Sequence, residues 1–367
     1  VPVALAIAAE RLPRDQRPLG LSTISVLDDA SSLAGPLWGT LIGVWLGWRG
    51  LFWMNIALGL PVLVAVVLLG RGVTSKQGGR VDWTGGVLLA AALGTLTFAL
   101  ADVAAEPRPL SQTIGFYVAA LALLGAFVLW ELRSKAPLID LRMFRSLRLT
   151  AANLVFFLEG GALITALVNI PLMTEVLWDM SGAQPGLMLM RMVLFMIVGG
   201  LLGGLLAPRL GYRAVAFAGF ALTAIGLFWM RAWPLEPSAA AQWGALAIAG
   251  LGFTLADAPI YATVMDAIDT GRRASATALL QVFQTTGMVL GMALLASQGL
   301  GRFDERAADL FEATALETDP EQYRAIIHQT FDETFLIAAV AMVLAAALSL
   351  LLGRSRREPE PILRKDR

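Results

Sequence analysis

The chain has 367 residues, of which 57% are hydrophobic and 15% charged, and its 28 Lys and Arg residues balance its 28 Asp and Glu residues. Soluble domains carry about 25% charged residues, so this composition excludes an ordinary water-soluble enzyme. The zero net charge excludes the basic field that nucleic-acid binding needs. The chain has no Cys and one His, His328, which excludes disulfides, thiolate metal sites and Ser-His or Cys-His chemistry. We therefore expect no enzyme activity, no metal and no cofactor.

Ten stretches are long and apolar enough to cross a hydrocarbon core of about 30 Å, which takes roughly 20 helical residues. Residues 1–9 are apolar but short and predict the end of a further helix. The predicted fold class is therefore all-α, a polytopic membrane protein with about ten complete spans and a partial one before them. The predicted spans are 19–46, 51–70, 84–101, 113–131, 150–176, 184–207, 214–233, 242–266, 275–299 and 332–352.

Positive charge is concentrated in alternate loops, because 21 of the 28 Lys and Arg residues lie in the loops and tail at one end of the predicted spans. Short cytoplasmic loops retain Lys and Arg, so this end is predicted to be cytoplasmic, together with the basic tail at 354–367. The protein is then a multi-pass protein of the plasma (inner) membrane. The acidic segment 300–330 becomes an external loop.

A Gly-Pro pair interrupts the span 19–46, within the stretch Ser-Ser-Leu-Ala-Gly-Pro-Leu-Trp-Gly-Thr at 31–40. Such a pair breaks the helical hydrogen-bond ladder and removes side-chain bulk, as suits a moving interface. The stretch resembles the antiporter motif in the fifth span of the 14-span drug:proton antiporter branch of the major facilitator superfamily, with Ser and Thr in place of its outer glycines. Residues 47–55 and 137–145 resemble the segments that enter the sixth and ninth spans of that branch. The motif positions are Ser31, Gly35, Pro36 and Gly39.

A second match and two departures accompany this resemblance. Gly204, Gly211 and Arg213 match the cytoplasmic loop signature of the family, but Pro208 stands where the signature has Asp. The first three spans of the branch and most of the fourth have no counterpart, which predicts either a fragment of a longer transporter or an unusual short form.

The resemblance also implies a division of the chain. Residues 1–70 would be the remainder of an N-terminal bundle and 71–135 two extra linker spans. Residues 136–353 would form a six-span C-terminal bundle, followed by the cytoplasmic tail at 354–367. Substrate and coupling ion would meet between the bundles near the membrane midplane.

Four ionisable residues are predicted to lie at one depth inside the spans. A charge at the bilayer centre costs about 2.5–3.5 kcal/mol on insertion scales, so each of these residues is expected to have a partner or a function. The resemblance implies that spans 19–46 and 184–207 face each other, so Arg191 is expected to pair with Asp28 or Asp29, with Glu159 as the second candidate partner. Protonation of the acidic member would then release Arg191. The alternative is a static ion pair that fixes helix register.

Weaker cavity candidates follow along the last spans. Asp257 falls in the cytoplasmic half of its span and is expected to line an inner vestibule or to face water. Thr277, Gln281 and Gln284 share one helix face, which fits either a cavity wall or interhelical hydrogen bonds. Phe157 lies deep enough to contact a lipophilic substrate, or simply to pack.

These features predict a secondary active transporter that exports lipophilic or cationic drug-like molecules in exchange for protons, by alternating access. Its expected partners are a small-molecule substrate, protons and the lipid bilayer, with no nucleic acid, and the expected state is a monomer. No Walker-type phosphate loop occurs, so ATP is not expected to drive transport. The alternatives are a facilitator for another metabolite or an anionic solute, and a truncated non-transporting protein that needs a partner.

Overall fold

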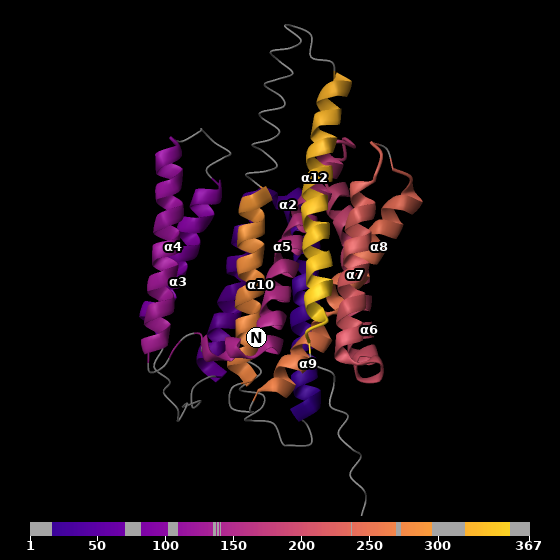
Figure 1. The fold of residues 1–367 in the computed structure, drawn as a ribbon. Helices are drawn as coiled ribbons and strands as arrows, with labels where there is room; N and C mark the ends of the chain where they lie inside the picture. The colour runs from indigo at the N-terminus through magenta and orange to yellow at the C-terminus, as the bar shows by residue number, and fades with distance from the viewer. Residues whose placement is uncertain are drawn as a thin grey trace, which may run out of the picture.

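The computed structural model consists of helices joined by turns and short irregular segments in the part of the chain that it describes, which comprises residues 17–69, 82–101, 109–134, 137, 139, 141–235, 237–268, 273–295 and 320–352. Figure 1 shows the helices running side by side in a common direction. In chain order they are α2 (Arg17–Leu69), α3 (Trp83–Ala101), α4 (Leu110–Arg133), the short 3-10 helix η2 (Leu141–Arg145), α5 (Leu147–Val176), α6 (Gln184–Leu210), α7 (Tyr212–Arg231), α8 (Ala239–Leu255), α9 (Asp257–Ala267), α10 (Arg273–Leu295) and α12 (Pro320–Ser349).

Nine segments among the described residues are long and apolar enough to cross a membrane, with α8 and α9 together forming one of them. They confirm the predicted all-α polytopic fold and correspond to the predicted spans from 51–70 onward. The remaining prediction, 19–46, falls on the first part of α2. Residues 1–9 lie outside the described part of the chain.

The long helix α2 is interrupted at Gly47, where the backbone has φ 68° and ψ 174°. Glycine adopts this left-handed region at little cost because it has no Cβ. The break falls between the two spans that the sequence predicts at 19–46 and 51–70, so α2 comprises two helical segments joined at one residue.

The helices from α5 onward share one core. α5 packs against α10 and α12, α7 packs against α8 and α12, and α6 packs against α8. Two further contacts join the earlier helices to this bundle: α2 lies against α6, and α3 lies against α10. α3 and α4 pair with each other and stand at one side of the bundle (Figure 1).

The core of the bundle consists of large apolar side chains, including Phe156, Phe220, Phe253 and Phe335. Large apolar side chains also cover the outside, as at Leu121, which is 68% exposed. In water such a surface would drive aggregation, whereas in a bilayer lipid tails cover it.

Close helix packing depends on glycine at α6 and α8. A Cβ on Gly199 or Gly203 would lie 2.3 or 2.5 Å from the carbonyl oxygen of Leu251 or Leu255, respectively. These two glycines therefore serve helix packing, as small residues do in membranes.

A proline separates α8 from α9. Pro259 has no N–H to donate to the Leu255 carbonyl, so the helix breaks there and α9 begins at Asp257.

The helix α12 begins at Pro320, twelve residues before the predicted start of the last span at 332. The last part of the segment predicted to be external, up to residue 330, is therefore helical. Two contacts hold this polar part of α12 against neighbouring loops: Arg324 Nη2 lies 2.7 Å from Asp179 Oδ2, and His328 Nε2 lies 2.7 Å from the Trp233 carbonyl oxygen. Hydropathy cannot detect such an extension because its residues are polar.

Candidate functional site: a buried carboxyl pair

Glu159 lies in the middle of α5 with only 2% of its surface exposed. Its carboxyl group lies beside the carboxyl group of Asp257, the first residue of α9, and the amide of Gln284 on α10, and its Oε2 atom is buried with no hydrogen-bond partner among the described residues. Asp257 and Gln284 are themselves half-buried. Three helices therefore bring two carboxyl groups and one amide together inside membrane-spanning segments.

Glycine makes this arrangement possible. A Cβ on Gly160 would lie 2.0 Å from the Gln284 carbonyl oxygen, and one on Gly287 would lie 1.9 Å from the Phe157 carbonyl oxygen. The backbones of α5 and α10 therefore touch on either side of Glu159. This close approach brings the Gln284 side chain within reach of the Glu159 carboxyl group.

The chemistry open to the pair follows from the proximity of its two carboxyl groups. One carboxyl group can hydrogen-bond to another only if one of them carries a proton, because an ionised carboxylate is an acceptor alone. Burial in a low-dielectric environment also makes two adjacent negative charges costly. The pair can therefore hold one proton, and separating the two groups would change its affinity for that proton.

The structure places Arg191 elsewhere, in a contact between α6 and α8. Its Nη1 donates hydrogen bonds to Gln242 Oε1 and Met188 Sδ, both at 3.2 Å. The guanidinium carbon lies 4.8 Å from the ring centroid of Trp243, which is a cation–π contact. Arg191 thus has its described partners on α6 and α8, whereas Glu159 has its partners on α9 and α10. The sequence analysis named Glu159 as the second candidate partner of Arg191, but the contacts described here for Arg191 do not include Glu159.

The expected acidic partners of Arg191 are Asp28 and Asp29 on α2. Their side chains lie outside the described residues, as do those of Ser31 and Pro36 in the antiporter-type motif. The helix that carries all four does contact α6. Gly35 and Gly39 are described, and a Cβ on either would meet nothing within 4 Å.

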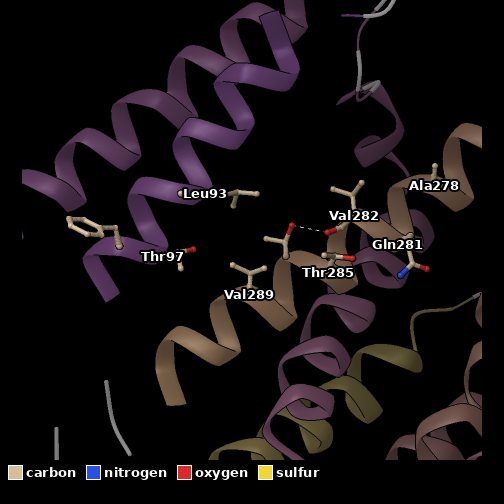
Figure 2. A pocket seen from close by; sticks show the side chains of 10 residues that line it. Leu93, Thr97, Ala278, Gln281, Val282, Thr285 and Val289 are labelled. Atoms are coloured by element: carbon tan, nitrogen blue, oxygen red, sulfur yellow. Dashed lines mark hydrogen bonds between the residues drawn. The ribbon is translucent and has the colours of Figure 1, made fainter. Parts of the chain in front are cut away.

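The structure separates the weaker cavity candidates. Asp257 and Gln284 join Glu159, as described, but Gln281 lines a different pocket, between α3 and α10 (Figure 2). Phe157 lines a third site, which is a small cavity of about 120 Å³ between α5, α10 and α12. Thr277 lies on α10 and lines neither of these cavities. Sequence periodicity placed Thr277, Gln281 and Gln284 on one helix face but could not say which neighbour each residue would meet.

The cytoplasmic loop signature falls at the turn between α6 and α7. Gly211 has φ 91°, a conformation that favours glycine, and it ends α6. Arg213 is exposed at the start of α7, and Gly204 has open space where a Cβ would be. Pro208 is accommodated inside α6.

Sequence reasoning missed the pairing of Glu159 with Asp257. The two residues are far apart in the chain, and their spans were expected to contribute to different features. The available signal was Pro259, because a proline two residues after an intramembrane Asp predicts a helix break that leaves the Asp at a helix start.

Comparison with known proteins identifies the family. The model of the Major Facilitator Superfamily matches residues 1–292 and 149–367. A Mycobacterium tuberculosis protein named a triacylglyceride transporter is 31% identical over 386 residues, which cover 98% of this chain and 74% of that protein. A triacylglyceride transporter of Mycobacteroides abscessus is 33% identical over 324 residues, covering 83% of this chain and 62% of the relative.

The fold is similar to that of a solved transporter structure. The chain is similar to a crystal structure of a bacterial homologue of the human lysosomal transporter Spinster, in an inward-facing and unoccupied conformation. The TM-score is 0.58 over 95% of this chain and 73% of that one, at 13% sequence identity. The nine apolar segments among the described residues agree with these matches, and the chain belongs to the Major Facilitator Superfamily as a multi-pass membrane transporter rather than an enzyme.

Proposed function

We propose that the chain moves neutral glyceride lipids by alternating access and couples this movement to protons. The observation that carries the proton coupling is the proximity of the buried Glu159 carboxyl group to the Asp257 carboxyl group, both inside membrane-spanning segments. The substrate class is supported by the similarity to proteins named triacylglyceride transporters, which extends over 98% of the chain.

In this proposal the carboxyl pair binds a proton in one conformation and releases it in the other. The contact between α2 and α6 provides a second element, because Arg191 lies on α6. Pairing of Arg191 with Asp28 or Asp29 would join the bundles in one state, and protonation of the acidic member would release it. The C-terminus lies in the cytoplasm, as the Lys and Arg distribution predicts.

A second candidate is the export of lipophilic or cationic drug-like molecules, as the resemblance to the drug:proton antiporters implies. The same carboxyl pair favours it, because desolvated acidic groups attract cations. The two candidates differ in the substrate that is moved, which is a neutral glyceride lipid in the first and a lipophilic or cationic drug-like molecule in the second.

The experiment measures transport in proteoliposomes that contain labelled trioleoylglycerol and an imposed pH gradient. We expect the wild-type chain to move the lipid faster with the gradient than without it, and Glu159→Gln to lose this response. Glu175→Gln is the matched control, because Glu175 lies on the same helix but is exposed.

Two results would contradict the proposal. Lipid movement by the wild-type chain at the same rate with and without the pH gradient would contradict proton coupling. Proton-driven uptake of a cationic dye, with no movement of trioleoylglycerol, would favour the drug-export candidate instead.

A further inference from the structure

A pocket of about 760 Å³ separates α3 from α10. Figure 2 shows Leu93 and Thr97 reaching from α3 toward α10, with Val282 and Val289 on the opposite wall. Its volume falls within the range of about 300–1,000 Å³ that is typical of ligand sites. It lies apart from the carboxyl pair, between the α3–α4 hairpin and the bundle that begins with α5.

The lining of this pocket selects for a neutral, apolar ligand. No residue that lines it is charged, and most of the lining surface is apolar. The residues on both walls belong to membrane-spanning segments, so the pocket lies at the depth of the lipid acyl chains. A cationic or anionic ligand would lose its hydration there without gaining a countercharge.

One edge of the pocket is polar and leads to the carboxyl pair. Gln281 lines the pocket, and its Nε2 donates a 3.1 Å hydrogen bond to Gln284 Oε1. The Gln284 amide in turn lies beside the Glu159 carboxyl group. A side-chain amide has two N–H donors, so Gln281 can bond Gln284 with one and an ester carbonyl with the other. Thr285 adds a hydroxyl group one helical turn further along.

We infer that this pocket binds one acyl chain of a glyceride, with the ester carbonyl of that chain at the Gln281 amide. The inference rests on the proposed function for the identity of the lipid. It adds the place where the lipid binds and a direct route, through Gln281 and Gln284, by which an occupied pocket alters the hydrogen bonding of Glu159.

The test uses a triacylglyceride that carries a photoactivatable diazirine on one acyl chain, added to the full chain in phosphatidylcholine liposomes. Irradiation should attach the probe to residues 93–98 and 278–289, as read by peptide mass spectrometry. Excess trioleoylglycerol should displace it, whereas added phosphatidylcholine should not.

Two variants and one control sharpen the result. A Cβ on Gly94 meets nothing within 4 Å and projects into the pocket, so Gly94→Phe should fill the site and reduce labelling about tenfold, a loss of ~1.4 kcal/mol in binding. Gln281→Leu should weaken labelling about fivefold by removing one hydrogen bond. Gly86→Phe, on the same helix and also in open space, should label like the wild-type chain.

The inference is overturned if Gly94→Phe labels like the wild-type chain, or if phosphatidylcholine displaces the probe as well as trioleoylglycerol does. Either result, obtained while the wild-type chain still moves trioleoylglycerol with the pH gradient, leaves the proposed function intact. Loss of that lipid movement in the wild-type chain would instead contradict the proposed function itself.

Discussion

Gly287 of α10 lies directly against the backbone of Phe157 on α5, so that a Cβ at position 287 would be 1.9 Å from the Phe157 carbonyl oxygen. Gly160 makes the reciprocal contact with the carbonyl oxygen of Gln284. The spacing of these two helices, and with it the contact between Gln284 and Glu159, therefore depends on the absence of side chains at two positions.

Gly287→Val should force α5 and α10 apart. Overpacking of this kind costs about 1–3 kcal/mol, so we expect a lower melting temperature in detergent together with loss of the pH response of transport. Gly125→Val on α4 is the control, because a Cβ there meets nothing within 4 Å. Equal melting temperatures for the two variants would show that the helices adjust without cost.

Asp82 should stabilise the α3–α4 hairpin in a pH-dependent way. The backbone N–H of Gly85 and then the indole N–H of Trp130 hold the pKa of Asp82 below its ordinary value of 3.8. Because the pKa is lowered on folding, the stabilisation is present above pH 3.8 and is lost as the pH falls through the folded-state pKa. Acid titration of the Trp130 indole NMR signal should show this loss.

Asp82→Asn is the comparison for that titration. The amide cannot ionise, so the acid-induced shift of the Trp130 indole signal should disappear. A Trp130 signal that still shifts in this variant would mean that another group is responsible.

The cation–π contact between Arg191 and Trp243 should contribute to the packing of α6 on α8. We expect a coupling free energy of about 0.5–2 kcal/mol in a double-mutant cycle of Arg191→Lys and Trp243→Leu, measured by unfolding in detergent. Lys keeps the charge but not the planar guanidinium. Arg209→Lys, at an exposed position on the same helix, should show no coupling with Trp243→Leu.

Asp28 and Asp29 are the proposed acidic partners of Arg191. Asp28→Asn and Asp29→Asn, singly and together, should reduce proton-coupled transport while leaving the protein folded and able to bind lipid. Full coupled activity in the double variant would remove this pair from the mechanism and leave Glu159 and Asp257 as the proton site.

The ion pair between Arg324 and Asp179 should matter little. Both side chains are largely exposed, and exposed pairs contribute about 0–1 kcal/mol. Arg324→Gln is therefore expected to change the melting temperature only slightly, and less at high salt. A large decrease would indicate that the polar start of α12 carries more of the stability than its exposure suggests.

Hydrophobic length and periodicity were enough to predict the helices and most of their bounds, because the bilayer imposes both on any helix that crosses it. They also singled out Glu159 and Asp257 as residues that need an explanation. They could not pair the two, because the pairing depends on the close contact at Gly160 and Gly287 and on the helix break before Asp257. They also could not show that the polar start of α12 continues into the last span, since it carries no apolar signal.

The break before α9 bears on how the carboxyl pair can change. α9 has 11 residues and a length of roughly 16 Å, and it follows a break at Ala256, whereas Glu159 is embedded in the 30 residues of α5. Because Asp257 adjoins this break, a change in the backbone dihedral angles of Ala256 and Asp257 would turn the Asp257 carboxyl group relative to Glu159 while α5 stays in place. Such a change at one break in a single span would alter the affinity of the carboxyl pair for a proton without rearranging the bundle around it.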